Sequence, residues 1–388
     1  RLTGAFGAIS GANLTGLGDG IDTKDASNDP TISTNPATGV GTVWLNKSTG
    51  ELFNCKDATA GSNIWVNIGG GNVSVYTYAG KVLGYITRGT SASVQIETVS
   101  LTSDSGGSNV SNLVWTKGIE VSSSSGSQSH THGYSAGGTN VGTTYETAIE
   151  KIQFASAAAS TDAGTLSVGS FGHAGHMSLT HGYTSGGTDA YNAAPAPGNL
   201  ARNIKIIQKY SFAAVATSVT IGNLDNTVRS LMGWSTKTHG YSGNGDESIP
   251  NSNLTQKDAK IQKFSFFSDG DAASTTSTLT VGRSTHSTAS SATHAYGAGG
   301  HGPSYTNVID KFSYASEGAG TDVGDLDGQT PYAASGSSST THGYCCGGVT
   351  PTATTRIHKY SFSSDANANN VGDLTDAGGY GPTQGSQY

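Results

Sequence analysis

Residues 293–314 read THAYGAGGHGPSYTNVIDKFSY, and both halves of this stretch recur along the chain. The first half returns as THGYSAGG at 131–138, THGYTSGG at 180–187, THGYSGNG at 238–245 and THGYCCGG at 341–348, with a weaker copy, LGYITRG, at 83–89. The anchoring tyrosines are 48 to 58 residues apart, and they are Tyr85, Tyr134, Tyr183, Tyr241, Tyr296 and Tyr344. One period with loop insertions therefore organises the chain.

The second half, IDKFSY, has five counterparts: IETVSL from Ile96, IEKIQF from Ile149, IQKYSF from Ile207, IQKFSF from Ile261 and IHKYSF from Ile357. Alternate residues of a strand share a face, so the fourth and sixth residues lie together. Both are apolar in every copy, which predicts a buried face. A leucine follows each copy and marks a further strand: Leu113, Leu166, Leu224, Leu279, Leu326 and Leu374.

Each repeat thus predicts four strands: a short strand of small residues, the HGY strand, the I-x-K strand and a strand near the leucine. One four-stranded sheet cannot bury both faces, whereas sheets arranged radially bury each face against the next. We expect an all-β fold in which residues 70–388 form a β-propeller of about six four-stranded blades. Solenoid stacking of the same units is the alternative arrangement.

Residues 293–314 resemble the kelch repeat, in which a double glycine closes one strand and an aromatic strand follows. The tryptophan usual in the fourth kelch strand is absent, and leucine stands near its place. The resemblance implies a kelch-like propeller.

Residues 41–69 break the period. VWLN and ELFNC flank KSTG as a hairpin and NIWVNI supplies a third strand, which predicts a small β meander with Trp44, Phe53 and Trp65 in its core. GGGNV at 69–73 is the expected linker. Residues 1–40 contain few large apolar groups and are expected to form an extended tether or attachment segment.

Residues 41–69, followed by units such as THGYxxGG and NVIDKFSYAS, resemble fibre and adhesin proteins of tailed bacteriophages, particularly marine phages. The resemblance covers most of residues 41–375. It implies a receptor-binding fibre protein in the virion, on the surface of the tail or fibre. It also implies a homo-oligomer, with a trimer suspected, whose N-terminal region binds other virion proteins. It implies no catalytic residue. No cofactor is expected.

Composition excludes some function classes. Charged residues make up 12% of the chain and its net charge is −7, which gives no electrostatic footprint for nucleic acid. No apolar run approaches the roughly 20 residues of a membrane helix. The chain carries 56 glycines but also 17 tyrosines, so simple disorder fits poorly.

Polar residues that recur once per repeat are expected to be structural. Equivalent histidines spread around a ring cannot converge on one metal ion, so we expect hydrogen bonds to the backbone of their own or the next blade and no metal site. These histidines are His132, His181, His239, His294 and His342. The recurring lysines are expected to contact backbone or to form an ion pair within the blade, with acids of the following turn such as Asp162, Asp322 or Asp365. They are Lys151, Lys209, Lys263, Lys311 and Lys359.

Cys345 and Cys346 occupy positions held elsewhere by small residues. Adjacent residues of a strand point to opposite faces, so the two thiols are poorly placed for a disulfide. We expect them to pack in the interior.

Recognition is expected where the copies differ most. The segments after the double glycine vary in length and emerge on one face of the propeller, and loops on a rigid scaffold commonly bind ligands. The candidates for contact with a host receptor, a surface glycan or protein, are Tyr145, Asp189, Tyr191, Asn192, Arg202, Asp246, Glu247, Asn251, His301 and Tyr305.

Catalysis is not expected. Glycoside cleavage requires two carboxylates about 5 to 10 Å apart across a cleft, whereas the acids here fall mostly in Asp-Gly turns. The chain is therefore interpreted as a non-enzymatic phage adhesin. The alternatives are a purely structural virion component and a glycan-degrading propeller enzyme.

Overall fold

The computed structural model of the 388-residue chain describes residues 21–26, 28–31, 33–36, 39–46, 51–69, 82–90, 93–112, 121–140, 145–154, 156, 158–191, 201–248, 255–350, 352–377 and 386–387. Every regular element among them is a β-strand, which confirms the all-β prediction. The chain divides into two compact units, Arg1–Tyr76 and Thr77–Tyr388. No helix suited to spanning a membrane occurs in the described part.

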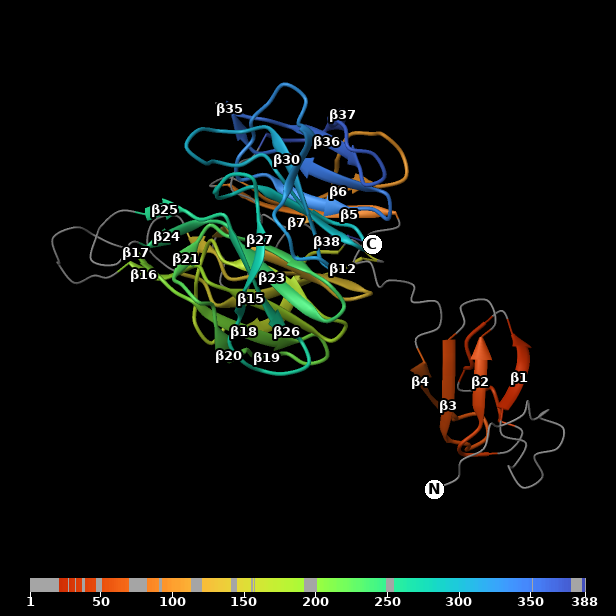
Figure 1. The fold of residues 1–388 in the computed structure, drawn as a ribbon. Coiled ribbons are helices and arrows are strands. Elements are labelled where there is room, and N and C mark those ends of the chain that lie inside the picture. Colours follow the sequence, from red (N-terminus) through yellow and green to blue (C-terminus); the bar gives the residue numbers. More distant parts are fainter. Residues whose placement is uncertain are drawn as a thin grey trace, which may run out of the picture. The chain divides into compact units, whose positions relative to one another are not determined.

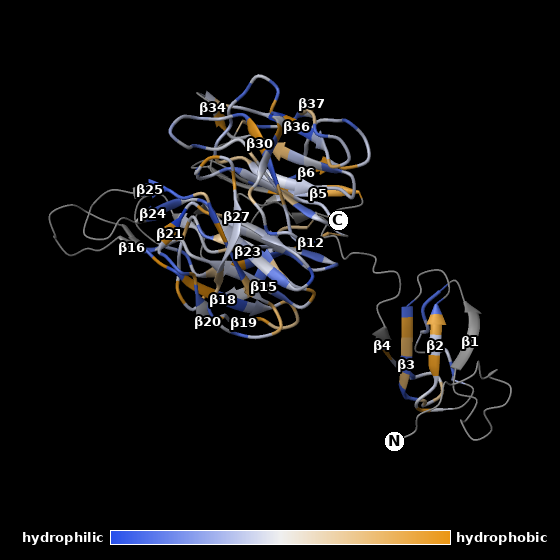
Figure 2. Cartoon of the chain, in the orientation of Figure 1, coloured by the Kyte–Doolittle hydropathy of each residue, from blue (hydrophilic) through white to orange (hydrophobic). Residues whose placement is uncertain are grey.

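The first unit is a four-stranded sheet in which the expected meander is present. Its strands are β1 (Ile21–Ala26), β2 (Val43–Asn46), β3 (Glu51–Asp57) and β4 (Ile64–Gly69). Trp44, Phe53 and Cys55 are buried, and the rings of Trp44 and Trp65 meet edge to face at 5.9 Å. Figure 2 shows the apolar residues of β2 and β3 in orange.

The expected boundary between tether and meander at residue 40 differs from the structure. β1 pairs in parallel with β2, at the edge of the sheet. Asn46 Nδ2 donates to Asp29 Oδ1 at 2.8 Å, and Trp65 Nε1 donates to Thr34 O at 3.1 Å. These polar groups require partners where the sheet covers them, and the preceding segment supplies the acceptors. Residues 1–20 of the expected tether lie outside the described residues.

The second unit contains six main sheets among its described residues, here named sheets 1 to 6 in chain order (Figure 1). Five are four-stranded and antiparallel, and sheet 2 adds a fifth, parallel strand to four antiparallel ones. Sheet 1 contains β38 (Ser386–Gln387), β5 (Leu83–Thr90), β6 (Ser93–Ser100) and β7 (Ser108–Asn112), and sheet 2 contains β9 (Ser125–Gln128), β10 (His132–Ala136), β12 (Ala148–Gln153) and β13 (Thr161–Thr165). Sheet 3 contains β14 (Ala174–Met177), β15 (His181–Ser185), β18 (Ile206–Ser211) and β20 (Val219–Asn223), and sheet 4 contains β22 (Met232–Ser235), β23 (His239–Gly243), β26 (Lys260–Ser265) and β27 (Ala273–Thr278). Sheet 5 contains β28 (Ser287–Ser290), β29 (His294–Ala298), β30 (Val308–Ser313) and β31 (Thr321–Asp325), and sheet 6 contains β32 (Ser335–Ser338), β33 (His342–Cys346), β36 (Arg356–Ser361) and β37 (Asn369–Asp373).

Short strands supplement these sheets. β19 (Ala216–Thr217) pairs in parallel with β13 of sheet 2. The others lie between the main strands: β8 (Val121–Ser122) with β11 (Thr139–Asn140), β16 (Thr188–Tyr191) with β17 (Ala201–Asn203), β21 (Val228–Arg229) with β24 (Asp246–Ser248) and β25 (Thr255–Lys257), and β34 (Val349–Thr350) with β35 (Thr352–Ala353).

The HGY motif has a packing explanation. In sheet 3, Gly182 pairs with Tyr210 of the neighbouring strand, and a Cβ at Gly182 would lie 2.3 Å from the Tyr210 ring. The glycine therefore makes room for the fourth residue of the I-x-K strand. Gly343 does the same for Tyr360 in sheet 6.

Aromatic rings join neighbouring sheets. The HGY tyrosine of one sheet packs on the sixth residue of the next sheet's I-x-K strand; Tyr183 stacks on Phe266 with ring centroids 4.7 Å apart. The same contact recurs at Tyr85–Phe154, Tyr134–Phe212, Tyr241–Tyr314 and Tyr296–Phe362. From sheet 6 to sheet 1, Tyr344 Oη donates to Leu101 O at 3.4 Å.

Contacts between the first strands of the sheets follow a cyclic order. β9, β14, β22, β28 and β32 touch in succession, β32 touches β5 and β38, and β38 touches β9. Close approach of these strands requires glycine, since a Cβ at Gly336 would lie 1.9 Å from Thr288 O. Pairing of the C-terminal β38 with β5 completes sheet 1.

Candidate recognition surface

Each sheet of the second unit has two ends that differ in chemistry. The loop end carries the connections that follow β10, β15, β23, β29 and β33 and those that precede β14, β22, β28 and β32. The turn end carries the Thr-His turns before the HGY strands and the turns after the I-x-K strands. The receptor-binding candidates belong to the loop end.

A hydrogen-bonded series of left-handed residues supports the loop end. Ser123, Gly172, Ser230, Thr285 and Ala333 have φ values of 57°, 63°, 53°, 53° and 55°. The N–H of each donates to the carbonyl of the one before it: Gly172 to Ser123 (3.1 Å), Ser230 to Gly172 (2.6 Å), Thr285 to Ser230 (3.1 Å) and Ala333 to Thr285 (2.7 Å). Neighbouring sheets thus hold each other's loops in a fixed position.

The residue before each left-handed residue pairs across with the residue that follows the double glycine. These pairs are Ser122 with Thr139, Phe171 with Thr188, Arg229 with Asp246, Ser284 with His301 and Tyr332 with Val349. The backbone arrangement is constant, but the side chains change from hydroxyl to aromatic, ionic and aliphatic. Chemical variation between the repeats is therefore concentrated at this end.

An ionic cluster occupies the loop end between sheets 4 and 5. Lys257 Nζ lies 2.5 Å from Asp246 Oδ1 and donates to Ser284 Oγ at 2.7 Å. Arg229 Nε lies 3.8 Å from Asp246 Oδ2. Glu247 accepts a hydrogen bond of 2.8 Å from Gln256 Nε2. The charges of this cluster are thus largely balanced within it.

An aromatic group adjoins the ionic cluster. Tyr305 stacks on Tyr332 with ring centroids 5.0 Å apart and planes 20° apart, and the His301 ring lies 4.7 Å from Tyr305. Tyr305 is 46% exposed. Partial burial, followed by the charge of Lys257, lowers the pKa of His301, whereas Asp246 opposes the shift. His301 is therefore neutral near pH 7 and can both donate and accept a hydrogen bond.

The structure brings Asp246, Glu247, His301 and Tyr305 into this region. Tyr145 lies elsewhere at the loop end, stacked on Phe171 at 5.4 Å and 19°. Asp189 lies in β16. For two further candidates, Tyr191 and Arg202, only the strand position is described, and Asn192 and Asn251 lie outside the described residues.

Sequence reasoning missed Lys257, Ser284 and Tyr332, which complete the cluster. Ser284 and Tyr332 lie outside the variable segments, in the connections that enter sheets 5 and 6. Each of them pairs with the residue that follows a double glycine, so alignment of the repeats could have identified them.

The recurring histidines at the turn end have different partners from those expected. Each His Nδ1 is hydrogen-bonded to the hydroxyl of the preceding threonine at 2.8 Å, rather than to backbone: Thr131–His132, Thr180–His181, Thr238–His239, Thr293–His294 and Thr341–His342. The tight turn places that hydroxyl closest to the ring. Burial, then the nearby lysine, lowers the pKa of every one of these histidines.

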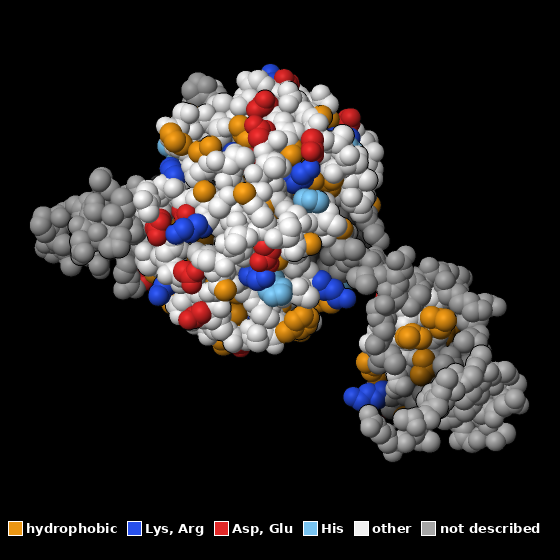
Figure 3. Space-filling view, viewed as in Figure 1, with side chains coloured by type: hydrophobic (Ala, Val, Ile, Leu, Met, Phe, Trp, Pro, Cys, Tyr) orange, Lys and Arg blue, Asp and Glu red, His pale blue; other side chains and the backbone are white. Residues whose placement is uncertain are grey.

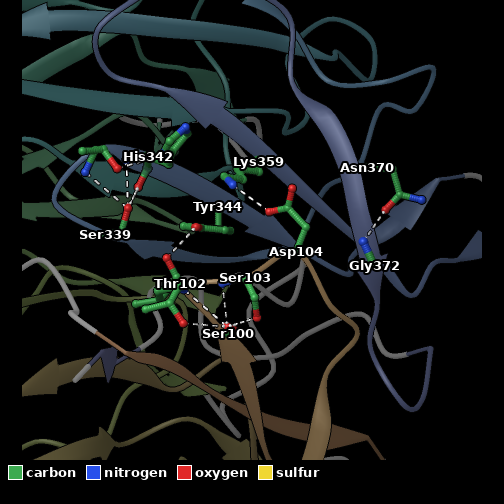
Figure 4. Close-up of polar contacts among 12 residues, drawn as sticks. Ser100, Thr102, Ser103, Asp104, Ser339, His342, Tyr344, Lys359, Asn370 and Gly372 are labelled. Atoms are coloured by element: carbon green, nitrogen blue, oxygen red, sulfur yellow. Dashed lines mark hydrogen bonds and ion pairs between the residues drawn. The ribbon is translucent and has the colours of Figure 1, made fainter.

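The recurring lysines reach the next sheet rather than the following turn of their own repeat. Lys359 of sheet 6 lies 2.6 Å from Asp104, beyond the I-x-K strand of sheet 1 (Figure 4). Matching pairs are Lys209–Asp269 at 2.5 Å, Lys311–Asp365 at 2.6 Å and Lys263–Glu317. The expected partners Asp162 and Asp322 are thus wrong, and Asp365 binds Lys311 rather than Lys359. The third residue of the I-x-K strand faces the following sheet, which explains the correction.

Lys151 is the exception, because the corresponding turn of sheet 3 contains Ala213, Ala214 and Val215. Within the described residues no acidic group pairs with it. Figure 3 shows the basic, acidic and histidine side chains in small separate groups across the visible face of this unit.

A further set of polar residues is buried between the sheets. The second residue of the I-x-K strand shares the buried face with the fourth and sixth, yet it is polar in all copies: Glu97, Glu150, Gln208, Gln262, Asp310 and His358 are at most 4% exposed. Gln262 Oε1 accepts from Asp225 N at 2.6 Å, and Glu97 Oε1 accepts from Thr375 N at 2.6 Å. Gln208 and Asp310 likewise accept hydrogen bonds from the turn after the leucine in the preceding sheet, and Glu97 does so from sheet 1 to sheet 6. Because alternate residues of a strand share a face, the sequence alone could have placed these residues on the buried face of the strand.

Asp310 has a buried ionic partner. Arg283 Nη2 lies 3.0 Å from Asp310 Oδ2, with side-chain exposures of 1% and 0%. Nη2 also donates to Gly297 O at 2.9 Å, and Asp310 accepts from Thr280 N and Oγ1. Burial lowers the pKa of Arg283 and raises that of Asp310, and each charge opposes the shift of the other. This pair is structural, because it is closed off from solvent.

The residues with metal-binding or nucleophilic chemistry have structural surroundings. His173 and His176 hydrogen-bond through both ring nitrogens to protein groups, and burial lowers the pKa of each to about 4. Cys345 and Cys346 are buried and unbridged, and burial raises the pKa of Cys345 to about 12. Among the described residues, no group of three His, Cys, Asp or Glu side chains is placed to hold a metal ion.

No protein-family model matches the chain, and no curated protein matches it.

Proposed function

We propose that the six sheets of residues 82–387 are the blades of a kelch-like β-propeller. The cyclic contacts of the first strands support this arrangement over an open solenoid. Three contacts join sheet 6 to sheet 1, as a ring requires: Tyr344 to Leu101, Lys359 to Asp104 and Thr375 to Glu97. A last strand that completes the first sheet, as β38 does, is a further means of closing such a ring.

We further propose that the chain is a non-enzymatic, virion-associated fibre or adhesin protein of a tailed phage, which binds a host cell-surface receptor through the loop end. One observation carries this proposal: the turn end repeats the Thr-His pair in sheets 2 to 6 and the Lys-acid pair in sheets 3 to 6, whereas the loop end changes its chemistry from one repeat to the next. Repetition is typical of scaffold contacts. Variation on a rigid scaffold is typical of recognition.

The first unit has a separate role in this proposal. It attaches the chain to other virion proteins, and the propeller units gather as a homo-oligomer, with a trimer as the expected state. Several copies on one particle raise the effective affinity of weak individual sites.

The test is adhesion of the fluorescently labelled full chain to a panel of marine bacteria. We expect saturable binding to permissive strains and loss of binding when unlabelled chain competes. Absence of binding to every strain that the parent particle infects would overturn the receptor function and favour a structural virion component. Shortening of surface polysaccharide by the chain would instead favour the enzyme alternative.

A further inference from the structure

We infer that two stacked aromatic pairs at the loop end, Tyr145–Phe171 and Tyr305–Tyr332, are subsites for the sugar rings of one neutral glycan. This inference rests on the proposed receptor function and names its ligand class. It commits to an uncharged, hydroxyl-rich polysaccharide that contacts both pairs.

The two pairs are structurally equivalent. Phe171 and Tyr332 each precede a left-handed residue, and Tyr145 and Tyr305 each pair with the residue after a double glycine, Thr139 and His301 respectively. Both stacks are nearly parallel, with interplanar angles of 19° and 20°. In the other pairs at this position the corresponding residues are Ser122, Arg229 and Ser284. The aromatic pairs are therefore additions to the scaffold rather than a requirement of it.

The Tyr305 side chain suits contact with a pyranose ring. It remains 46% exposed although it is stacked on Tyr332, so an accessible aromatic surface is held in a fixed position. Aromatic side chains combine such an apolar face with a hydroxyl that hydrogen-bonds. His301 lies 4.7 Å from Tyr305 and supplies further donor and acceptor positions for sugar hydroxyls.

The electrostatics favour an uncharged ligand. Next to the Tyr305 pair, Asp246 neutralises Lys257 and lies 3.8 Å from Arg229. The whole chain carries a net charge of −7, which repels an anionic polysaccharide.

The cyclic order places the two pairs on opposite sides of the ring. Phe171 lies between sheets 2 and 3, and Tyr332 lies between sheets 5 and 6, three sheets further on. A long glycan that crosses the loop end contacts both pairs, whereas a short one contacts one pair at a time. Affinity is therefore expected to rise with chain length.

The test is titration of the full chain with cellohexaose, laminarihexaose and mannohexaose, and with the polymers laminarin, mannan and anionic alginate. Isothermal titration calorimetry measures binding. We expect a neutral hexasaccharide to bind, its polymer to bind more tightly, and alginate not to compete. Loss of one stacking surface in Tyr305→Ala is expected to weaken hexasaccharide binding about 5- to 10-fold.

Variants separate stacking from other effects. Tyr305→Phe is expected to retain most of the affinity, and Tyr145→Ala to reduce polymer binding more than hexasaccharide binding. The matched control is Phe267→Ala, which removes a 79% exposed ring at the turn end and should change nothing. Thermal unfolding confirms that each variant folds.

Three results would overturn the inference: no binding of any neutral glycan, preference for alginate, or wild-type affinity in both Tyr305→Ala and Tyr145→Ala. If the chain still adheres to permissive cells in those cases, the receptor proposal stands and only the ligand class is wrong. If neutral glycans bind but cells do not, the receptor proposal is wrong instead.

Discussion

The buried pair Arg283–Asp310 allows a sharp test of how adjoining sheets are held together. Sheets 3 and 4 have uncharged Gln208 and Gln262 at the position of Asp310. Asp310→Gln alone leaves the Arg283 charge buried without its partner, at a side-chain exposure of 1%. Breaking a buried pair in this way destabilises the fold by roughly 3–5 kcal/mol.

The double variant Arg283→Met/Asp310→Gln removes both charges and keeps most of the side-chain volume. We expect it to be more stable than Asp310→Gln by about 2 kcal/mol or more, because no uncompensated charge remains. The single variant Arg283→Met should differ from the wild type in how its stability depends on pH. Removal of the arginine charge takes away the main factor that lowers the Asp310 pKa, so the pKa rises further above its ordinary value. The folded state then binds the proton more tightly, and the stability of Arg283→Met falls as the pH rises from 5 to 7.5 relative to wild type.

Urea unfolding followed by near-ultraviolet circular dichroism, at pH 5 and pH 7.5, measures these differences. The control is Lys311→Met, which breaks an ion pair whose Asp365 is 58% exposed and should cost at most about 1 kcal/mol. Additive losses in the double variant would refute the reasoning, since they would show that the two charges are not coupled.

Three further predictions concern the packing. Thr285 is β-branched at a φ of 53°, so Thr285→Gly should raise the stability by about 0.5–1 kcal/mol, and a lower melting temperature would contradict this. Gly336→Ala should cost about 1–3 kcal/mol, because its Cβ would meet Thr288 O at 1.9 Å, whereas Gly270→Ala, with nothing within 4 Å, should be nearly neutral in the same melting experiment. Burial lowers the folded pKa of His176 from 6.5 to about 4, so the unfolded chain binds the proton more tightly and the stability falls as the pH drops from about 6.5 to 4. His176→Gln should remove about 2 kcal/mol of this loss of stability at pH 5. A variant whose stability has the same pH dependence as the wild type would count against the prediction.

The strands of the repeats could be predicted because apolar residues occur at every second position in the two recurring segments, the HGY strand and the I-x-K strand. The I-x-K strand has apolar residues at its fourth and sixth positions, and Phe264 and Tyr360, at the fourth, are buried. The same argument predicted that Cys345 and Cys346 point apart, and they pack in different clusters of the interior.

Other features depend on neighbours that the repeat pattern does not specify. A lysine such as Lys311 has acids in its own repeat and in the next, and only the direction of its strand face selects Asp365. Strand β1 has a polar sequence, IDTKDA, and joins its sheet through backbone pairing with β2. The sequence of this strand carries no signal of that pairing.

The recognition surface was only partly predictable for a related reason. Variable loop length points to His301 and Tyr305, but their partners Ser284 and Tyr332 come from connections of nearly constant length. Proximity between sheets 4, 5 and 6 creates the cluster, and that proximity follows from packing of whole sheets.

The most direct test of binding through the loop end is hydrogen–deuterium exchange of the full chain, measured free and bound to membrane vesicles prepared from the surface of permissive cells. Binding through the loop end predicts added protection at residues 244–248, 299–307 and 329–334. The turn-end residues 267–271, 315–320 and 363–367 should exchange unchanged. Protection confined to the turn end, or to residues 21–69, would contradict the account.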